Sequence, residues 1–483
     1  MVTQIKKVIL SGVYWSTVNQ VFTQVVGLGV TAVLARLLTP ADFGLVAMVT
    51  LATGFLKILK DFGIGAALVQ KKHVSHEEYS TVFWLNMALG ALFTAVTFAV
   101  AGPVSEFYHE PLIKPITQVF SFSFLVNAVG VVWSNLLIKQ VDFKQIFYRN
   151  LVSVVLSGGM GIAAALYGWG FWALILQQYA LIVINTYLNY TRSGWWPSFC
   201  FKREFLSDLF KFSLPLLGDK SLNYWMRNVD NLLVGRFLGK NDLGYYTKAY
   251  SLMLLPVKQL SGTITKVLFP SFSLIQDDVD KIASIYLKIS RAIAFVSFPV
   301  MINLSIFAEP LILMVYGDNW RPVIPLFQVL SLLGMFQAIG TLSGNVYLAR
   351  GKTLLMFKVG VFSRLLMIVG IVVGLYSGGI MPMIYGYCIT SLLAFLPELY
   401  FLGIIINTSL FALIRNFMPY FFISLITGIA VYYAFAAVEL GIIAEMTIGS
   451  IVFGILYILL CWVFNLSALK ELLALVKSYR KTR

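Results

Sequence analysis

Charged residues are scarce in this chain, at 12% of its 483 residues, whereas about a quarter of the residues in water-soluble domains are charged. Hydrophobic residues account for 59% of the sequence, and the mean hydropathy is +0.84. So few charged groups cannot cover the surface of a water-soluble globule. The composition therefore excludes a soluble protein and predicts an all-α polytopic membrane protein.

Cysteine is almost absent, and the connections predicted on the outer side are short. The three cysteines, Cys200, Cys388 and Cys461, are far apart, and each lies in an apolar or juxtamembrane setting. They predict neither a disulfide nor a metal site, and we expect no cofactor. The longest outer connections, around 103–114 and 236–248, leave no room for a folded extracellular domain.

Acidic residues are few, with 21 Asp and Glu against 36 Lys and Arg and a net charge of +15. A basic excess can indicate nucleic-acid binding, but here the basic residues follow membrane topology. By the positive-inside rule, both termini are predicted to be cytoplasmic, and nucleic acid is not an expected partner. The predicted cytoplasmic basic residues include Lys6, Lys7, Lys71, Lys72, Lys139, Lys144, Arg149, Arg192, Lys202, Arg203, Arg350, Lys352, Lys477, Arg480, Lys481 and Arg483.

About fourteen apolar spans follow one another, each long enough to cross a hydrocarbon core of about 30 Å. The first begins like a signal peptide, but it is too long and no clear cleavage site ends it, so it is predicted to be an uncleaved span. The charged connections 193–211 and 271–291 predict helices that lie on the inner leaflet. The spans are predicted near 12–35, 43–68, 80–102, 115–138, 150–167, 170–191, 210–237, 246–270, 291–316, 325–348, 353–377, 380–403, 411–436 and 440–464.

One stretch occurs twice and indicates two related halves. Residues 34–45 read LARLLTPADFGL and residues 234–245 read VGRFLGKNDLGY, with the Arg, one Leu, the Asp and the Gly offset by 200 residues. Each copy joins one span to the next. Because an even number of spans per half makes the repeats parallel, any shared cavity lies between them. We predict two pseudo-symmetric six-helix bundles around a central cavity, at 1–198 and 199–405, followed by a helix pair and a cytoplasmic tail at 406–483.

The repeated turn is predicted to be a structural hinge. Thr39 as N-cap, Pro40 at the first helical position and Asp42 in the first turn make a start that resembles a capping box. In the second copy, Gly239 would cap the helix and Asp242 takes the equivalent place. The Arg that ends the preceding helix lies near an acid with which it can pair. The predicted pairs are Arg36 with Asp42 and Arg236 with Asp242.

Polar residues inside the spans predict a cavity. In the span 210–237, five polar or charged side chains fall within an arc of roughly 100° around the helix. Because charges at the middle of a bilayer are costly, this stripe must face protein or a wet cavity. Ion pairs that lock the helix to its neighbours are the alternative. The stripe consists of Asp219, Lys220, Asn223, Arg227 and Asp230. The cavity is predicted to be lined also by Gln20, Gln24 and Tyr224.

The stripes carry more positive than negative charge, which predicts a cavity that prefers an anion. Arg suits phosphate or pyrophosphate by its fork of donors, and Lys suits it as a point charge. Lys57 and Lys60 have a second interpretation, since they could snorkel to the interface. Glu398 either carries a coupling ion or pairs with a neighbouring helix. The predicted anion-binding residues are Arg227, Lys258, Lys220, Lys57, Lys60 and Arg364, and the predicted ion-coupling acids are Asp219, Asp230 and Glu398.

The repeated motif, together with DNLLVGRFLG at 230–239, LGYYTKAY at 243–250 and VLFPSFS at 267–273, resembles the bacterial polysaccharide transporter family. The match is nearest to Wzx-type, colanic-acid-exporter-like flippases, whose superfamily also holds multidrug exporters and lipid II flippases. It extends over nearly the whole chain. The resemblance implies a V-shaped pair of bundles that alternates between inward-open and outward-open states. It also implies that the helix pair at 411–464 forms a groove for a lipid tail.

The same resemblance implies a transporter and not an enzyme. Its substrate would be an undecaprenyl-pyrophosphate-linked oligosaccharide, moved from the cytoplasmic to the periplasmic leaflet of the bacterial inner membrane for exopolysaccharide or lipopolysaccharide O-antigen biosynthesis. Cavity cations would grip the pyrophosphate, and Na⁺ or H⁺ would be the coupling ion. Membrane lipid, a polysaccharide polymerase and chain-length regulator proteins are the other expected partners. The first span lacks the arginines of lipid II flippases, which argues against a peptidoglycan precursor.

Two other functions remain as alternatives. A multidrug exporter of the same superfamily would favour an acidic cavity for cationic drugs, whereas this cavity is predicted to be net basic. A membrane glycosyltransferase or ligase could use Asp42 as an outward-facing catalytic carboxylate. Because Asp42 lies in a tight turn and recurs as Asp242, a structural role is favoured.

Overall fold

The computed structural model describes residues 2–61, 74–139, 143–202, 221, 224–225, 227–436 and 441–471. Within these residues, 12 helices are long and apolar enough to cross a membrane, and no strand occurs. The chain divides into two compact units, Met1–Gly244 and Tyr245–Arg483. The prediction of an all-α polytopic membrane protein is therefore confirmed.

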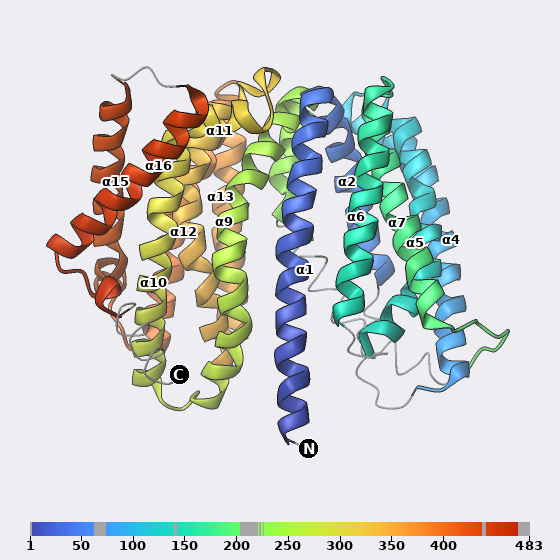
Figure 1. Cartoon of the computed structure of the whole chain (residues 1–483), viewed down its shortest axis with the longest axis horizontal. Coiled ribbons are helices and arrows are strands. Elements are labelled where there is room, and N and C mark those ends of the chain that lie inside the picture. Colours follow the sequence, from blue (N-terminus) through green and yellow to red (C-terminus); the bar gives the residue numbers. More distant parts are fainter. Residues whose placement is uncertain are drawn as a thin grey trace. The chain divides into compact units, whose positions relative to one another are not determined.

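The first unit consists of pairs of long helices that pack side by side. The pairs are α4 with α5, α6 with α7, and α1 with α6 (Figure 1). Small residues allow the close approach: a Cβ on Gly90 of α4 would lie 2.7 Å from the side chain of Ala128 on α5. The helices are α1 (Val2–Leu37), α2 (Pro40–Asp61), α4 (His76–Tyr108), α5 (Ile113–Lys139), α6 (Phe143–Leu166) and α7 (Phe171–Ser193).

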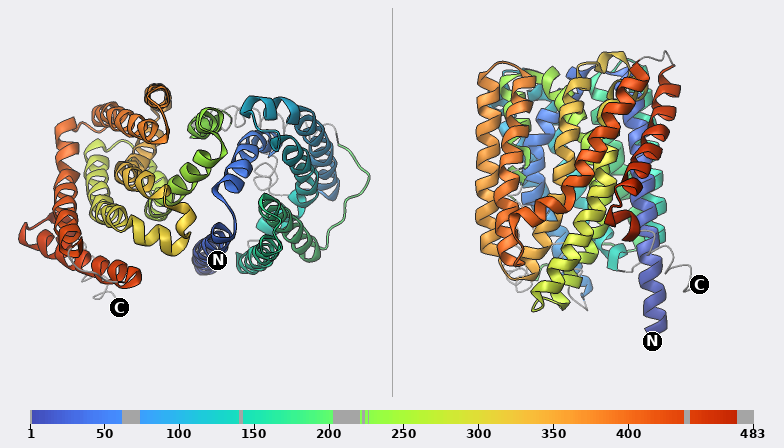
Figure 2. Two further views of the ribbon diagram at one scale, coloured as in Figure 1. Left: turned by 90° about the horizontal axis from the view of Figure 1, so that it is seen from above. Right: turned by 90° about the vertical axis from the view of Figure 1, so that its left-hand side faces the viewer.

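The second unit is built around α12, whose residues are buried along most of its length between α10 and α14. The helices α13 and α14, in orange, lie side by side, and their backbones touch at Gly370 and Gly386 (Figure 2). The elements are α9 (Gly239–Leu274), which starts in the first unit, α10 (Val279–Ile306), α11 (Ala308–Val315), η1 (Asp318–Trp320), α12 (Val323–Ala349), α13 (Thr353–Tyr376), α14 (Ile380–Ile405), α15 (Leu410–Ala436) and α16 (Ile442–Val463).

The prediction of an interfacial helix at 271–291 is wrong. Helix α9 continues to Leu274 and α10 begins at Val279, so the charged residues lie at the ends of two long helices joined by a short turn. The side chain of Asp278 caps α10 by accepting a hydrogen bond from the backbone N–H of Lys281 at 3.0 Å. Mixed charge with helical periodicity is typical of both an interfacial helix and the water-exposed end of a spanning helix.

The structure describes only part of the other predicted spans and connections. In the connection 193–211, Ser193 ends α7, residues 194–202 are not helical, and residues 203–211 lie outside the described residues. The span predicted at 291–316 is two helices, α10 and α11, which meet at Phe307. Of the span predicted at 210–237, the structure describes 221, 224–225 and 227–237, all helical, and the span at 246–270 lies within α9. The boundary between the two compact units lies between residues 244 and 245. The limits predicted at 198 and 405 concern the sequence repeats, and they stay predictions.

Candidate functional site: the duplicated turn and the charged residues of the spans

The turn between α1 and α2 is the predicted capping box. The backbone N–H and the hydroxyl of Thr39 donate to Oδ2 of Asp42 at 2.8 and 2.7 Å. In return, the backbone N–H of Asp42 donates to the hydroxyl of Thr39 at 3.3 Å. Helix α2 begins at Pro40, where the missing N–H costs nothing. The predicted capping box is therefore present, and the role of Asp42 as a structural hinge stays a prediction.

The second copy of the turn also starts a helix, with different residues. Helix α9 begins at Gly239, whose φ of +86° lies in the region that favours glycine. Asp242 follows in the first turn, half-buried, and burial raises the pKa of its carboxyl group above the ordinary value. An Asp in the first helical turn is therefore common to both copies, while a glycine takes the position of Thr39.

The two copies cross each other at their glycines. A Cβ on Gly44 would overlap the backbone carbonyl oxygen of Lys240, and a Cβ on Gly244 would overlap that of Pro40. All four residues belong to the first unit. The contacts are reciprocal, since the same two positions of each copy meet the equivalent positions of the other. The duplicated Gly is therefore explained by a close crossing of two helix starts.

Neighbouring side chains secure this crossing. The ammonium group of Lys240 pairs with Glu110, which follows α4, at 2.9 Å. The guanidinium of Arg236 lies 5.6 Å from the ring centre of Phe107 on α4, a cation–π contact. Arg36 is exposed. The ion pairs predicted between Arg36 and Asp42 and between Arg236 and Asp242 stay predictions.

Removal of the Asp42 carboxylate is expected to weaken this turn. Asp42→Ala removes both hydrogen bonds from Thr39 and should cost about 1 kcal/mol of stability, whereas Asp42→Asn keeps one acceptor oxygen and should cost less. Thermal unfolding of the purified protein in detergent measures the order of the two variants. Normal amounts of Asp42→Asn protein without any polysaccharide product would instead support a catalytic carboxylate.

The predicted anion-binding residues occupy different environments. Lys57 on α2, Lys258 on α9 and Arg227 are exposed, whereas Arg364 on α13 is half-buried. Lys220 lies outside the described residues, and of Lys60 only the helical backbone is described. Exposed charge within a membrane-length helix must meet water or polar groups. Lys57 is exposed near the end of α2, which is long and apolar enough to span a membrane; Lys57 and Arg227 belong to the first unit and Lys258 to the second.

The other predicted polar residues divide between exposed and packed positions. Gln20 is exposed and Gln24 is half-buried on α1. Tyr224 is used in packing: its hydroxyl donates to the backbone carbonyl of Leu51 on α2 at 2.6 Å. Asp230 is buried, and the side chain of Asn231 donates to it at 3.4 Å. The remaining predicted residues, Asn223 and Asp219, lie outside the described residues.

The second unit brings two predicted residues together. The carboxylate of Glu398 on α14 interacts electrostatically with Arg364 and lies beside Ser363, both on α13. The hydroxyl of Tyr347 on α12 donates to the backbone carbonyl of Glu398 at 3.4 Å. Arg364 was predicted as an anion ligand and Glu398 as a coupling acid or an ion-pair partner. Their proximity favours the pairing interpretation for both.

A buried polar network in the first unit was missed in the sequence. The guanidinium of Arg149 on α6, which is buried, donates to the side chain of Asn189 on α7. The amide of Asn189 donates to Asn185 at 3.1 Å, Asn185 donates to Asn150 at 3.4 Å, and Asn150 donates to Asn19 on α1 at 3.2 Å. The only local signal is the spacing of Asn185 and Asn189, which puts both on one helix face. Arg149 was predicted instead to be one of the cytoplasmic basic residues.

The fold has a counterpart of known structure. The chain superposes on "Lipid II flippase MurJ, inward closed conformation" with a TM-score of 0.73, covering 94% of this chain and 98% of the other at 13% identity. At that identity the likeness shows the fold alone.

Sequence comparison then places the chain. The model of the family described as "Polysaccharide biosynthesis protein" matches residues 33–325, more than half of the chain, and the chain belongs to this family. The lipopolysaccharide biosynthesis protein WzxC of Escherichia coli (strain K12) is 27% identical over 390 residues, 80% of this chain and 78% of the relative. The teichuronic acid biosynthesis protein TuaB of Bacillus subtilis (strain 168) is 28% identical over 483 residues, 99% of this chain and 97% of the relative.

Proposed function

We propose that this protein is a flippase that moves an undecaprenyl-pyrophosphate-linked oligosaccharide from the cytoplasmic to the periplasmic leaflet by alternating access. The observation that carries the proposal is the exposure of Lys57 on α2, Arg227 and Lys258 on α9, in a member of a polysaccharide biosynthesis family with a flippase fold. A polyprenyl-pyrophosphate-linked sugar carries negative charge at its pyrophosphate whatever its sugars are. Exposed cations among apolar helices are the groups that would replace the water around this pyrophosphate.

We propose that the membrane potential supplies energy for transport. Two negative charges that move outward gain about 2.3 kcal/mol per charge per 100 mV from an inside-negative potential. A Na⁺ or H⁺ gradient would then reset the carrier. This energy source is tested by imposing potentials and ion gradients on reconstituted vesicles. A transport rate that none of them changes would contradict the proposal. The inner membrane, cytoplasmic termini and a polymerase with its chain-length regulator as partners belong to the same proposal.

Arg227→Ala is expected to reduce export by about 10- to 100-fold, because a charge-assisted hydrogen bond contributes roughly 1.5–3 kcal/mol. Arg227→Lys should recover little, since the fork of donors is lost. Surface polysaccharide in a deletion strain is measured, with the amount of membrane-inserted protein determined in parallel. Arg321→Ala is the matched control, because Arg321 makes exposed ion pairs with Glu309 and Asp318.

A double variant separates substrate binding from charge neutralisation. Asp230 lies one helical turn from Arg227 and is buried. If Arg227 only neutralises this acid, Arg227→Ala/Asp230→Ala should export normally, because no unpaired buried charge remains. The flippase proposal expects the double variant to stay inactive. Normal export by the single Arg227→Ala variant would also exclude Arg227 as a ligand.

A further inference from the structure

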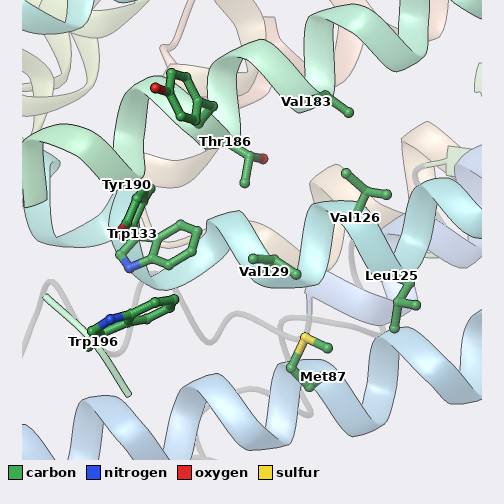
Figure 3. Close-up of a pocket in the computed structure, with 10 residues that line it drawn as sticks. Met87, Leu125, Val126, Val129, Trp133, Val183, Thr186, Tyr190 and Trp196 are labelled. Atoms are coloured by element: carbon green, nitrogen blue, oxygen red, sulfur yellow. The ribbon is translucent and has the colours of Figure 1, made fainter.

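The first unit contains an apolar groove that the proposed function does not use. It lies over α5, with Met87 of α4 on one side and Val183 of α7 on the other (Figure 3). Its volume is about 440 Å³, within the range of about 300–1,000 Å³ that is typical of ligand pockets. Trp133, Tyr190 and Trp196 lie together at one end (Figure 3).

The floor of the groove depends on a close approach of α5 and α7. A Cβ on Gly130 of α5 would lie 2.6 Å from Oγ1 of Thr186 on α7, so only glycine permits this spacing. Met87 on α4 and Val183 on α7 stand on either side of α5 and form the walls. The floor and walls of the groove are therefore built into the packing of three helices.

A strap of residues 195–202 closes the aromatic end, and hydrogen bonds hold it in place. The indole N–H of Trp84 donates to the carbonyl of Ser198 at 2.9 Å, and that of Trp133 donates to the carbonyl of Trp195 at 3.0 Å. The ring of Trp196 consequently lies 5.4 Å from the ring of Tyr190 and 6.3 Å from that of Trp133. The end of the groove is thus preformed.

The rim of the groove is exposed on a helix of membrane-spanning length. Its rim residues Val183 and Tyr187 are 49% and 61% exposed on α7, which is long and apolar enough to span the membrane. The exposed ring of Trp196, at 65%, and the tyrosines at this end are the residue types that settle at a membrane interface. An apolar occupant that reaches the interface at the aromatic end fits both features.

Two basic residues are described beyond the aromatic end. Helix α5 ends at Lys139, and the last turn of α7 carries the exposed Arg192. Of the acids at the start of α4, Glu77 pairs with Lys202 and Glu78 accepts the backbone N–H of Ser75 in the helix cap. An anionic headgroup at this end would therefore lie near Lys139 and Arg192.

We propose that the groove binds one acyl chain of an anionic phospholipid from the surrounding bilayer, with its headgroup beside Arg192 and Lys139. The chain lies along α5 between α4 and α7, and the phosphate lies beyond Trp196. Basic residues next to membrane helices attract anionic lipids in this way. The bound lipid fills the space between α4 and α7 that no side chain occupies.

Native mass spectrometry of the full chain tests this proposal by counting the lipids retained after exchange into phosphatidylglycerol or phosphatidylcholine micelles. Val129→Trp, which fills the groove from α5, and Val183→Trp, which fills it from α7, should each retain one phosphatidylglycerol fewer. Val155→Trp on α6 is the matched control, since this exposed valine lies outside the groove. Unchanged melting temperatures show that the variants fold. Because the two substitutions fill the groove from different helices, the test remains valid if one of the variants does not fold.

The headgroup is tested separately. Arg192→Gln and Lys139→Gln should each reduce the preference for phosphatidylglycerol over phosphatidylcholine by about fivefold. Lys114→Gln, at the opposite end of α5, should leave the preference unchanged. Equal retention of both lipids by the original chain, or unchanged retention in both groove-filling variants, would overturn the proposal. Displacement of the lipid by undecaprenyl phosphate would overturn it in favour of a site for a polyprenyl tail.

Discussion

Gly44→Ala and Gly244→Ala are each expected to lower export by about tenfold. Each ~1.4 kcal/mol by which a variant destabilises the folded protein lowers the ratio of folded to unfolded protein by that factor. In either variant the new Cβ overlaps a backbone carbonyl oxygen, of Lys240 or of Pro40. Backbone cannot rotate away as a side chain can, so the two helix starts must separate. Such overpacking typically costs about 1–3 kcal/mol and occasionally more.

The same substitution elsewhere provides a control of opposite sign. At Gly29 on α1 and Gly102 on α4, no neighbouring atom lies within 4 Å of the position that a Cβ would take. There, alanine should be neutral or stabilising by up to about 1 kcal/mol, because glycine is the poorer helix former. Thermal unfolding in detergent and polysaccharide export are measured for all four variants. If Gly44→Ala and Gly244→Ala behave like the two controls, the crossing does not matter for folding or transport.

Arg364→Met is expected to destabilise the second unit strongly. It leaves the carboxylate of Glu398 without its basic neighbour inside a spanning helix, and a charge at the centre of a membrane helix costs roughly 2.5–3.5 kcal/mol. Arg364→Met/Glu398→Gln should recover most of that stability, because neither charge remains. The melting temperatures of both variants in detergent provide the measurement.

Transport by the double variant then assigns the role of the pair. Export restored together with stability would show that Arg364 and Glu398 form a structural ion pair. A stable but inactive double variant would show that one of the two charges takes part in substrate or ion movement. A single Arg364→Met variant as stable as the original chain would contradict the interaction itself. Lys358→Met, on the same helix, is the matched control.

Local sequence patterns determined the membrane class and the helix starts. A spanning helix satisfies its own backbone hydrogen bonds and needs about 20 apolar residues, so hydropathy alone locates it. The same holds for the capping box of Thr39 and Asp42, which are three residues apart. The interfacial helix at 271–291 was predicted wrongly because charge periodicity does not say whether a helix lies on the membrane or ends at it.

Only the tertiary structure decided which residues meet across the chain. The repeat predicted equivalent glycines at 44 and 244, but the reciprocal crossing depends on how α2 and α9 approach each other. Asn19 and Asn150 are 131 residues apart, and Ser198 lies 114 residues from Trp84, so no local pattern predicts either contact. The lipid bilayer selects apolar spans one at a time, whereas close packing selects partners by shape and by the need to satisfy buried polar groups. The apolar spans can be read along the sequence, whereas the contacts between distant residues exist only once the helices are packed.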